Sequence, residues 1–178
     1  HIALREINSE RKSPAYFALG KVSFSTDERG CLVINTPHLQ QQRFITNDIV
    51  QLVDTTHFEW LGRHDNVINS GGVKLFPESI EARIASFLSQ RFFITAEDDN
   101  RLGQKAVLVI ESLPWDEAEC QQLLSRLKSC LSPYEVPKNI YFQEHFTETY
   151  SGKIVRKIKK TRTDESFTFL SLPPFKTF

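Results

Sequence analysis

Residues 61–74 read LGRHDNVINSGGVK, and residues 150–156 read YSGKIVR. Both stretches place glycine close to fixed charges. Glycine allows the backbone to turn tightly or to swing, and a lysine carried on such a backbone can meet an anion. These two stretches are the strongest indication of fold and function in the chain.

Composition sets wide bounds. A chain of 178 residues can form one good core, or a small domain together with part of another. Hydrophobic residues make up 40% and charged residues 25%, as in an ordinary globular protein. Lysine plus arginine equals aspartate plus glutamate at 22 each, so no net charge attracts nucleic acid or an anionic membrane. We therefore expect neither as a partner.

The cysteine, histidine and apolar patterns exclude further classes. The cysteines form an odd set without CxxC spacing, which favours reduced thiols over a disulfide framework or a zinc site: Cys31, Cys120 and Cys130. The five histidines show no ligand spacing, so we expect no metal site in this chain. No apolar run approaches the roughly 18 residues of a membrane span, and no signal-peptide pattern opens the chain. We expect a cytoplasmic protein.

The first third of the chain has the pattern of short strands. Such runs occur at residues 21–24, 31–34, 49–53 and 57–61. No convincing helix occurs here, so we expect a few strands of an antiparallel subdomain, which are marginal alone. The chain also opens on His1 and contains no methionine, so we expect a fragment of a longer protein.

After Gly72 the pattern changes. Pro77 opens a predicted amphipathic helix, with Glu78 and Glu81 in its first turn where they complement the helix dipole. Its apolar side chains share one face: Ile80, Ile84, Phe87 and Leu88. A second helix is predicted over residues 115–131, where leucines keep helical spacing before Ser132-Pro133.

Strands are expected between and after these helices. Runs at 91–95 and 104–110 predict a strand pair around a polar turn at 97–100, and residues 138–142 predict another strand. The region from 65 to 162 is thus predicted to be a compact α+β domain.

Lys153 follows glycine in the predicted turn at residues 150–153. A long side chain with a point charge suits phosphate and carboxylate oxygens. The plainer alternative is a solvated lysine in a basic run with Arg156, Lys157, Lys159, Lys160 and Arg162. Taken alone the turn favours that alternative, so the functional interpretation depends on the second motif.

Together the two motifs resemble the swivelling C-terminal lid of the adenylate-forming enzymes, the family of acyl-CoA synthetases and related ligases. The family has a Pro-x-Thr-x-Ser-Gly-Lys turn; Thr147 replaces the proline, and the remaining positions match in Thr149, Ser151, Gly152 and Lys153. The resemblance implies that Lys153 is catalytic and bridges the acyl carboxylate and the α-phosphate region of ATP.

The same resemblance assigns nucleotide and hinge residues. FITND at 44–48 is similar to the family's Tyr-x-Thr-Gly-Asp, whose aspartate accepts hydrogen bonds from both ribose hydroxyls, so Asp48 is a nucleotide-binding candidate, with a turn cap as its alternative. Asn47 replaces the glycine, and since asparagine tolerates positive φ we expect a turn there. Residues 62–65, GRHD, match the family's Gly-Arg-x-Asp hinge. This match implies that Arg63 reaches the ribose and that Asp65 is the pivot of the domain rotation.

Three further residues are implied to bind CoA. Gly71 and Gly72, followed by Lys74 and by PESIE at 77–81, make the match to the family specific. The resemblance implies that the glycine backbone lines the pantetheine passage and that Lys74 lies near the CoA phosphates. A plain hairpin turn is the alternative for the glycine pair.

The resemblance also implies a domain division. Residues 1–62 would be the β-rich end of a large N-terminal domain, 63–66 the hinge, 67–162 the lid domain and 163–178 a tail. The expected fold class is α+β, a small lid with a mixed sheet and helices preceded by antiparallel strands. The phosphate loop and the Thr-Glu pair that holds Mg²⁺ would lie upstream, so we expect a C-terminal fragment that is inactive alone.

The implied function is that of an AMP-forming acid-CoA ligase. An acid attacks ATP to give an acyl-adenylate and pyrophosphate, and CoA then displaces AMP, so we expect ATP, Mg²⁺, CoA and a small carboxylic acid as cofactors and partners. TNDIVQ and GRHDNVINSGGVKL look most like the o-succinylbenzoate-CoA ligases of menaquinone biosynthesis. A ligase for another acyl or aryl acid stays open, as do a non-enzymatic anion-binding module built on residues 153–162 and a homodimer.

Overall fold

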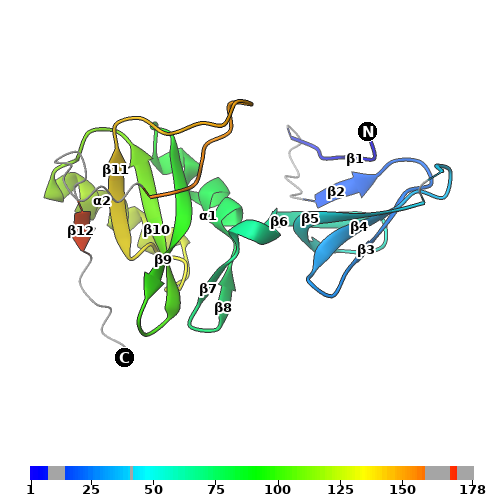
Figure 1. Ribbon diagram of the computed structural model, residues 1–178, viewed down its shortest axis with the longest axis horizontal. Helices are drawn as coiled ribbons and strands as arrows, with labels where there is room; N and C mark the ends of the chain where they lie inside the picture. The colour runs from blue at the N-terminus through cyan, green and yellow to red at the C-terminus, as the bar shows by residue number, and fades with distance from the viewer. Residues whose placement is uncertain (8–14, 41, 159–168, 172–178) are drawn as a thin grey trace. The chain divides into compact units, whose positions relative to one another are not determined.

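The computed structural model describes residues 1–7, 15–40, 42–158 and 169–171. The chain divides into two units, His1–Val67 and Ile68–Phe178 (Figure 1). Each unit has a sheet and a hydrophobic core of its own.

The first unit is built on a sheet in which all neighbouring strands are antiparallel. Its strand order is β1-β2-β6-β5-β4-β3. The strands are β1 (Ala3–Leu4), β2 (Ala15–Ala18), β3 (Ser23–Thr26), β4 (Cys31–Asn35), β5 (Arg43–Leu52) and β6 (His57–Arg63). The antiparallel strands expected for this part of the chain are confirmed.

An aromatic cluster forms the centre of this unit's core. Phe58 on β6 packs edge to face against Phe24 on β3, with ring centroids 4.8 Å apart. It also stacks on Tyr16 of β2 at 5.2 Å. Aromatic pairs in these geometries stabilise a core beyond the burial of their apolar surface.

Strand β5 is longer than the sequence predicted. We expected a turn within 44–48 and a strand at 49–53, but one strand includes most of both, and no described non-glycine residue has a positive φ, Asn47 included. The predicted turn was wrong because the segment continues as a strand with a bulge: β4 pairs with Phe44 and Ile45 and again with Ile49, and the register shifts between these pairs. A second register shift lies between Ile49 and Val50, where β5 pairs with β6.

The second unit has a mixed sheet. Its strand order is β12-β11-β10-β7-β8, with β9 also paired to β10. Strands β10 and β11 are parallel, and the other pairs are antiparallel. The strands are β7 (Ile68–Ser70), β8 (Val73–Leu75), β9 (Phe92–Asp99), β10 (Gly103–Glu111), β11 (Asn139–Gln143) and β12 (Phe169–Ser171). The expected α+β class is confirmed.

Two helices pack on this sheet, as the apolar periodicity predicted. Helix α1 spans Pro77–Ile84 and continues into the short 3-10 helix η2 (Ala85–Phe87), and α2 spans Glu117–Cys130. A capping box begins α2: Asp116 Oδ1 accepts from Glu119 N at 2.8 Å, and Glu119 Oε2 accepts from Asp116 N at 3.0 Å.

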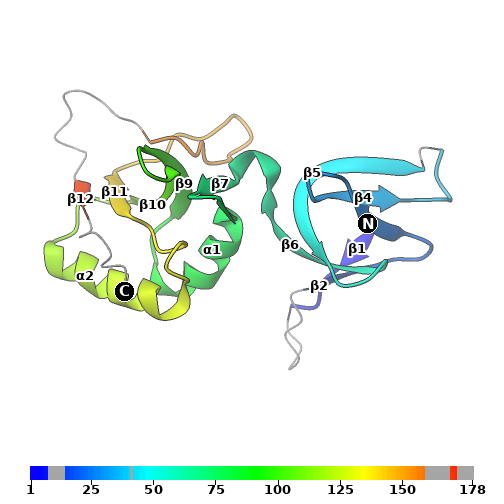
Figure 2. The same ribbon diagram turned by 90° about the horizontal axis from the view of Figure 1, so that it is seen from below.

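Strand β10 separates two apolar layers, because alternate residues of a strand point to opposite faces. The core shared with both helices receives Ala106, Leu108 and Ile110. A smaller cluster on the other face receives Val107 and Val109. Ile154 and Ile158 pack against this smaller cluster. Figure 2 accordingly shows α1 and α2 on one side of the sheet and the orange segment around residue 150 on the other.

Strand β9 runs to Asp99, whereas the prediction ended it at Thr95 and placed a polar turn at 97–100. Glu97 pairs in register with Lys105 of β10, and their charged groups lie 3.4 Å apart. Opposite charges across a ladder stabilise the strands that carry them. The polar residues therefore continue the strand, and the turn follows it.

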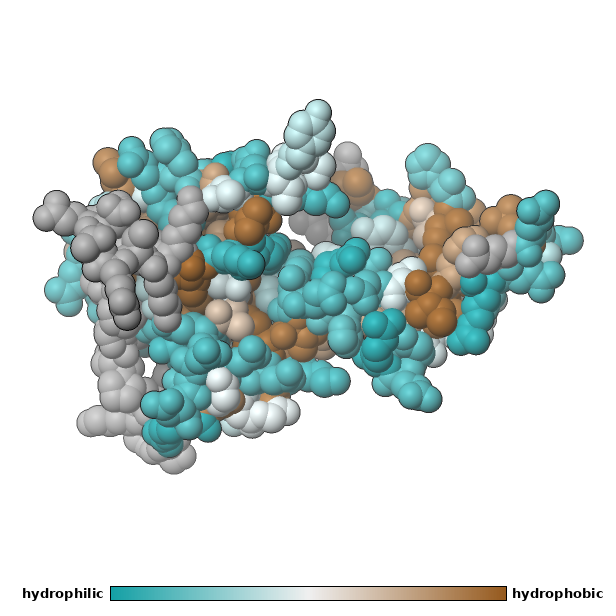
Figure 3. Space-filling view, viewed as in Figure 1, coloured by the Kyte–Doolittle hydropathy of each residue, from teal (hydrophilic) through white to brown (hydrophobic). Residues whose placement is uncertain are grey.

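Strand β12 lies in the stretch that we expected to be a tail, and it pairs with β11. The other residues of 163–178 lie outside the described residues. On the face shown in Figure 3, hydrophilic residues cover most of the coloured surface. Within the described ranges, the helices are too short and too polar to cross a membrane.

Candidate functional site

Asp48 and Arg63, the two nucleotide-binding candidates, are brought together by neighbouring strands of the first unit. They are paired in register on β5 and β6, and Arg63 Nη1 lies 3.4 Å from Asp48 Oδ1. Trp60 Nε1 donates to the same oxygen at 3.3 Å. The Asp48 side chain keeps 31% and the Arg63 side chain 49% of its surface exposed, so a ligand can reach both.

The hinge candidate Asp65 lies in the short 3-10 helix η1 (His64–Asn66). Its Oδ2 accepts a hydrogen bond from Asn47 Nδ2 at 2.6 Å. Asn47 Oδ1 in turn accepts from Arg29 Nη1 at 3.2 Å, and Arg29 is paired with Asp27 at 2.9 Å. Asn47, which stands where the resembled family has glycine, thus ties the hinge candidate to a charged turn within the same unit.

Gly71 and Gly72 form the two-residue turn between β7 and β8, with φ values of 59° and 84°. Positive φ at both positions is what a two-residue hairpin turn of this kind requires. A Cβ at Gly71 would lie 3.0 Å from the Leu102 side chain, whereas one at Gly72 would meet nothing within 4 Å. Both glycines and Lys74 are exposed. The pair is therefore a hairpin turn with an accessible backbone.

Lys153 lies on a tight turn in the second unit. Thr149 N donates to Lys153 O at 2.8 Å, and Gly152 N donates to Thr149 O at 2.9 Å. Lys153 N donates to Thr149 Oγ1 at 3.1 Å. The Lys153 side chain is exposed and forms no ion pair with another residue in the described part of the chain. Its backbone is therefore held while its ammonium group is accessible to an anion.

Arg156 does not belong to a solvated basic run. It forms a two-point ion pair with Glu81 of α1, at 2.6 Å and 2.8 Å, and the two side chains are only 27% and 17% exposed. Ile94 N donates to Glu81 Oε1 at 2.7 Å. Burial raises the pKa of Glu81, while the bonds from Arg156 and Ile94 act in the opposite direction. We expected Glu81 to complement the helix dipole; instead it joins α1 to β9 and to the segment after Lys153. Lys157 is exposed, and the other basic residues of the run lie outside the described residues: Lys159, Lys160 and Arg162.

Arg91 joins two acidic residues next to the Lys153 turn. Its Nη2 donates to Glu111 Oε1 at 2.7 Å, and its Nη1 donates to Glu148 Oε1. Glu148 forms an isolated antiparallel bridge with Ile154, directly after Lys153. The hydrogen bond from Arg91 lowers the pKa of Glu111 to about 2. The charged group of Arg91 thus connects the end of β10 with the base of the turn.

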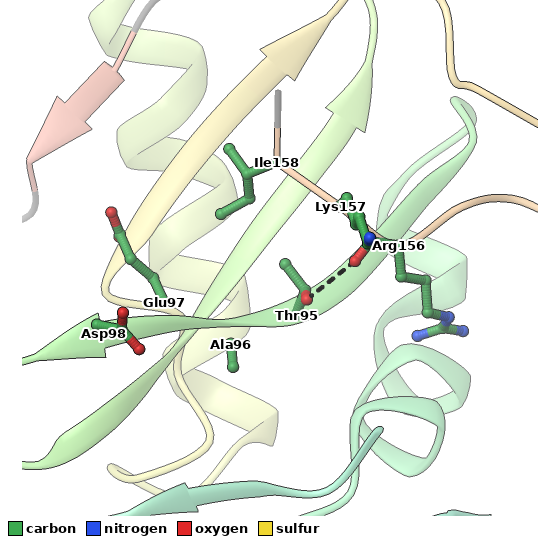
Figure 4. A pocket seen from close by; sticks show the side chains of 7 residues that line it. All are labelled: Thr95, Ala96, Glu97, Asp98, Arg156, Lys157 and Ile158. Carbon is green, nitrogen blue, oxygen red and sulfur yellow. Dashed lines mark hydrogen bonds between the residues drawn. The ribbon is translucent and has the colours of Figure 1, made fainter. Parts of the chain in front are cut away.

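A cavity of about 300 Å³ lies between β9 and the segment that follows the Lys153 turn (Figure 4). Its lining consists of Thr95, Ala96, Glu97, Asp98, Arg156, Lys157 and Ile158. Figure 4 shows the Arg156 side chain extending from the segment toward α1. The candidate residues from the sequence do not line this cavity, so it is separate from the candidate site.

The described residues contain no group of three or more His, Cys, Asp or Glu side chains that could hold a metal ion. The Mg²⁺ that the resemblance implies is therefore assigned to none of the residues that the structure describes. Cys31 and Cys120 are buried, and burial raises the pKa of both thiols, while Cys130 is exposed.

Three residues next to the candidates were not singled out as site residues from the sequence: Trp60, Glu81 and Arg91. A signal existed for Trp60, since it shares a strand with Arg63. None existed for the other two, because their partners Arg156 and Glu148 are 75 and 57 residues away along the chain.

No family model matches the chain. Among curated proteins it is similar to the medium-chain acyl-CoA ligase Mig of Mycobacterium avium, with 34% identity over 98 residues, 54% of this chain and 18% of that protein. It is also similar to the uncharacterized acyl-CoA ligase YhfT of Bacillus subtilis, with 30% identity over 172 residues, 94% of this chain and 34% of that protein. The chain spans about a third or less of the length of these relatives.

Solved structures give the same picture. An acyl-CoA synthetase (AMP-forming)/AMP-acid ligase II-like protein from Dyadobacter fermentans is 41% identical, with a TM-score of 0.51 over 88% of this chain and 45% of that one. The o-succinylbenzoate CoA synthetase of Bacillus subtilis, in complex with its acyl-adenylate intermediate, has a TM-score of 0.63 at 19% identity, over 82% of this chain and 34% of that one. The second likeness shows the fold alone.

The mixed sheet and few helices of the chain match the C-terminal domain of adenylate-forming ligases. Curated relatives and solved structures therefore agree with the resemblance that the motifs first indicated. Together they support placing the chain in the adenylate-forming acyl-CoA ligase superfamily. They do not single out one enzyme of that superfamily.

Proposed function

We propose that the chain is the C-terminal part of an AMP-forming acid-CoA ligase. The observation that carries the proposal is the exposed ammonium of Lys153 on a turn whose backbone is fixed by hydrogen bonds to Thr149. A long cationic side chain on a fixed turn suits an anion that arrives from outside this unit. The 41% identity to an AMP-forming acyl-CoA synthetase supports the same class.

In the first half-reaction, a carboxylate oxygen of the acid attacks the α-phosphorus of ATP, and the bond from that phosphorus to pyrophosphate breaks. Negative charge builds on the phosphoryl oxygens in the transition state. Lys153 would place its positive charge against these oxygens, and a preorganised electrostatic group of this kind is worth about 3 to 4 kcal/mol. Lys153 is thus the proposed catalytic residue of acyl-adenylate formation.

Asp48 and Arg63 would hold the nucleotide during this step. A carboxylate can accept hydrogen bonds from two neighbouring ribose hydroxyls, and Arg63 stands 3.4 Å away as a second ribose contact. The hydrogen bond from Trp60 to Asp48 Oδ1 would orient the carboxylate for that task. These two residues form the proposed nucleotide-binding site of the first unit.

In the second half-reaction, the CoA thiol attacks the acyl carbonyl and AMP leaves. The proposal assigns Asp65 as the pivot about which the lid turns between the two steps. The accessible turn of Gly71 and Gly72 would then line the pantetheine passage, since residues without side chains allow a close approach. The exposed ammonium of Lys74 would meet the CoA phosphates.

For the acid we propose o-succinylbenzoate, because TNDIVQ and GRHDNVINSGGVKL look most like ligases for that substrate. The fold is shared with the Bacillus subtilis o-succinylbenzoate CoA synthetase. A medium-chain fatty acid is the second candidate, favoured by the 34% identity to the medium-chain acyl-CoA ligase Mig. The two candidates differ in the acyl pocket, which we expect upstream of this chain.

The test is an assay of the intact protein with ATP, Mg²⁺, CoA and a panel of acids. The panel contains o-succinylbenzoate, medium-chain fatty acids and benzoate derivatives, and the readouts are pyrophosphate, AMP and acyl-CoA. We expect the highest kcat/KM with o-succinylbenzoate. A higher value with a fatty acid would reassign the substrate, and the absence of acid-dependent AMP release across the panel would refute the ligase. The 178-residue chain alone should catalyse no ATP-pyrophosphate exchange.

A further inference from the structure

The Lys153 turn closes a short hairpin, residues 147–155. Val155 N donates to Thr147 O at 2.8 Å, Glu148 bridges Ile154, and Thr149 N donates to Lys153 O. In Figure 1 the orange tip of this segment extends beyond the sheet of the second unit. A hairpin of two short strands is marginally stable by itself in water. Its position therefore depends on how its two strands are attached to the sheet.

The upstream strand is attached through an arginine. Arg91, just before β9, donates to Glu148 on the hairpin and to Glu111 at the end of β10. The carboxylate of Glu111 is mostly covered, at 16% exposure, and its Oε1 also accepts a hydrogen bond from Phe146 N at 2.7 Å, so one partner of Arg91 is fixed by the backbone. We call this set, Arg91 with Glu111 and Glu148, the first clamp.

The downstream strand is attached through a second arginine. Arg156 follows the hairpin directly and forms its two-point ion pair with Glu81 on α1. Glu81 is fixed in turn by Ile94 N of β9, and Thr95 Oγ1 donates to Arg156 O at 3.4 Å (Figure 4). We call this set, Arg156 with Glu81, the second clamp. Fork-to-carboxylate pairs restrict both distance and direction, unlike a single point contact.

We propose that the two clamps are positioning residues for Lys153, which fix the hairpin on the sheet so that the ammonium reaches its anion in a narrow range of places. The inference rests on the proposed function. Catalytic groups must be held closely, since a displacement of about 1 Å can cost on the order of 100-fold in rate. The clamps act only through Lys153 and touch no substrate.

Two substitutions loosen the clamps, and both keep the opposite charges of the mostly buried pair of Arg156 and Glu81. Glu148→Gln weakens the first clamp at its exposed partner, while Arg91 keeps Glu111. Arg156→Lys keeps the positive charge beside Glu81 but cannot form the two-point fork. Glu135→Gln is the matched control, because it weakens another arginine-carboxylate pair of the same unit, with Arg83 of α1, that does not touch the hairpin.

In the intact protein, both clamp variants should slow acyl-adenylate formation by about ten- to a hundredfold, measured by ATP-pyrophosphate exchange. Thioester formation from supplied acyl-adenylate should stay within about twofold, and Glu135→Gln should leave both steps unchanged. In a Lys153→Ala background, Arg156→Lys should add less than about twofold, because the clamp then has no lysine to position. Two results would overturn the proposal in favour of a stabilising role. One is an equal loss of rate in both steps, and the other is a loss from Arg156→Lys that is as large in the Lys153→Ala background as in the wild type.

Hydrogen exchange on the 178-residue chain tests the same clamps without any reaction. Backbone amides of the hairpin, including those of Thr149 and Val155, should exchange at least about fivefold faster in both clamp variants, while those of α2 stay unchanged. Unchanged hairpin exchange would refute the clamps even in an active enzyme. A wild-type protein inactive with every acid would instead refute the proposed function, and exchange alone would then decide whether the clamps hold the hairpin.

Discussion

Replacing Lys153 with alanine removes the proposed catalytic charge while leaving the fold of the hairpin in place. The hydrogen bonds that fix the turn come from the backbone of residue 153 and from Thr149 and Gly152, and alanine keeps all of them. The lysine side chain is exposed and has no ionic partner among the described residues. The substitution therefore perturbs the charge alone.

The structure sets two magnitudes for this variant. An exposed side chain without partners contributes within about 0.5 kcal/mol to the free energy of unfolding. Loss of one preorganised electrostatic group from the transition state costs about 3 to 4 kcal/mol, a factor on the order of 100 to 1,000 in rate. The expected loss of activity is thus several times larger in free energy than the loss of stability. Unfolding cannot account for it.

The assay separates the two half-reactions of the intact protein. Lys153→Ala should reduce ATP-pyrophosphate exchange by that factor and leave thioester formation from supplied acyl-adenylate nearly intact, with an unchanged urea midpoint. Lys157→Ala, a change at another exposed lysine of the same segment, is the control and should affect neither step. Equal losses in both half-reactions would refute the assigned role of Lys153.

Three further outcomes are expected. Asp48→Asn should raise the KM for ATP at least about tenfold, because the amide replaces one accepting oxygen with a donor, and an unchanged KM would remove Asp48 from the nucleotide site. Gly71→Ala and Gly72→Ala should each lower the free energy of unfolding by about 1 to 2 kcal/mol, because both positions have a positive φ. Gly71→Ala should cost more, because its Cβ would lie 3.0 Å from the Leu102 side chain, and equal losses in urea titrations would mean that Leu102 moves aside. The pKa of Glu111 falls from 4.5 to about 2 on folding, so its charged form is favoured in the fold, and its contribution to stability is complete above about pH 4.5 and is lost as pH falls toward 2. Acid titration of Glu111→Gln should show a shallower loss across that window, and an identical slope would contradict the ion pair with Arg91.

The sequence predicted the helices and most strands because these depend on local patterns. Apolar side chains at helical spacing predicted α1, and Ser132-Pro133 correctly indicated that α2 ends nearby. The lengths of β5 and β9 were wrong. Glu97 looks like a turn former until its partner Lys105 on β10 is known, and Asn47 lies where the pairing of β5 with β4 is irregular. Strand pairing is a property of two distant segments, and one segment alone does not report it.

The resemblance to the superfamily, the α+β class and the candidate residues were all readable from the sequence, because glycine turns and charged motifs lie in short consecutive stretches. The folded chain was needed to see that Arg63 stands beside Asp48, that Asn47 donates a hydrogen bond to the hinge candidate Asp65, and that Arg156 is an internal ion-pair partner rather than part of a basic surface. A side chain's charge is fixed by its identity, but its role depends on which opposite charge the fold brings within a few ångströms and how far water is excluded from the pair.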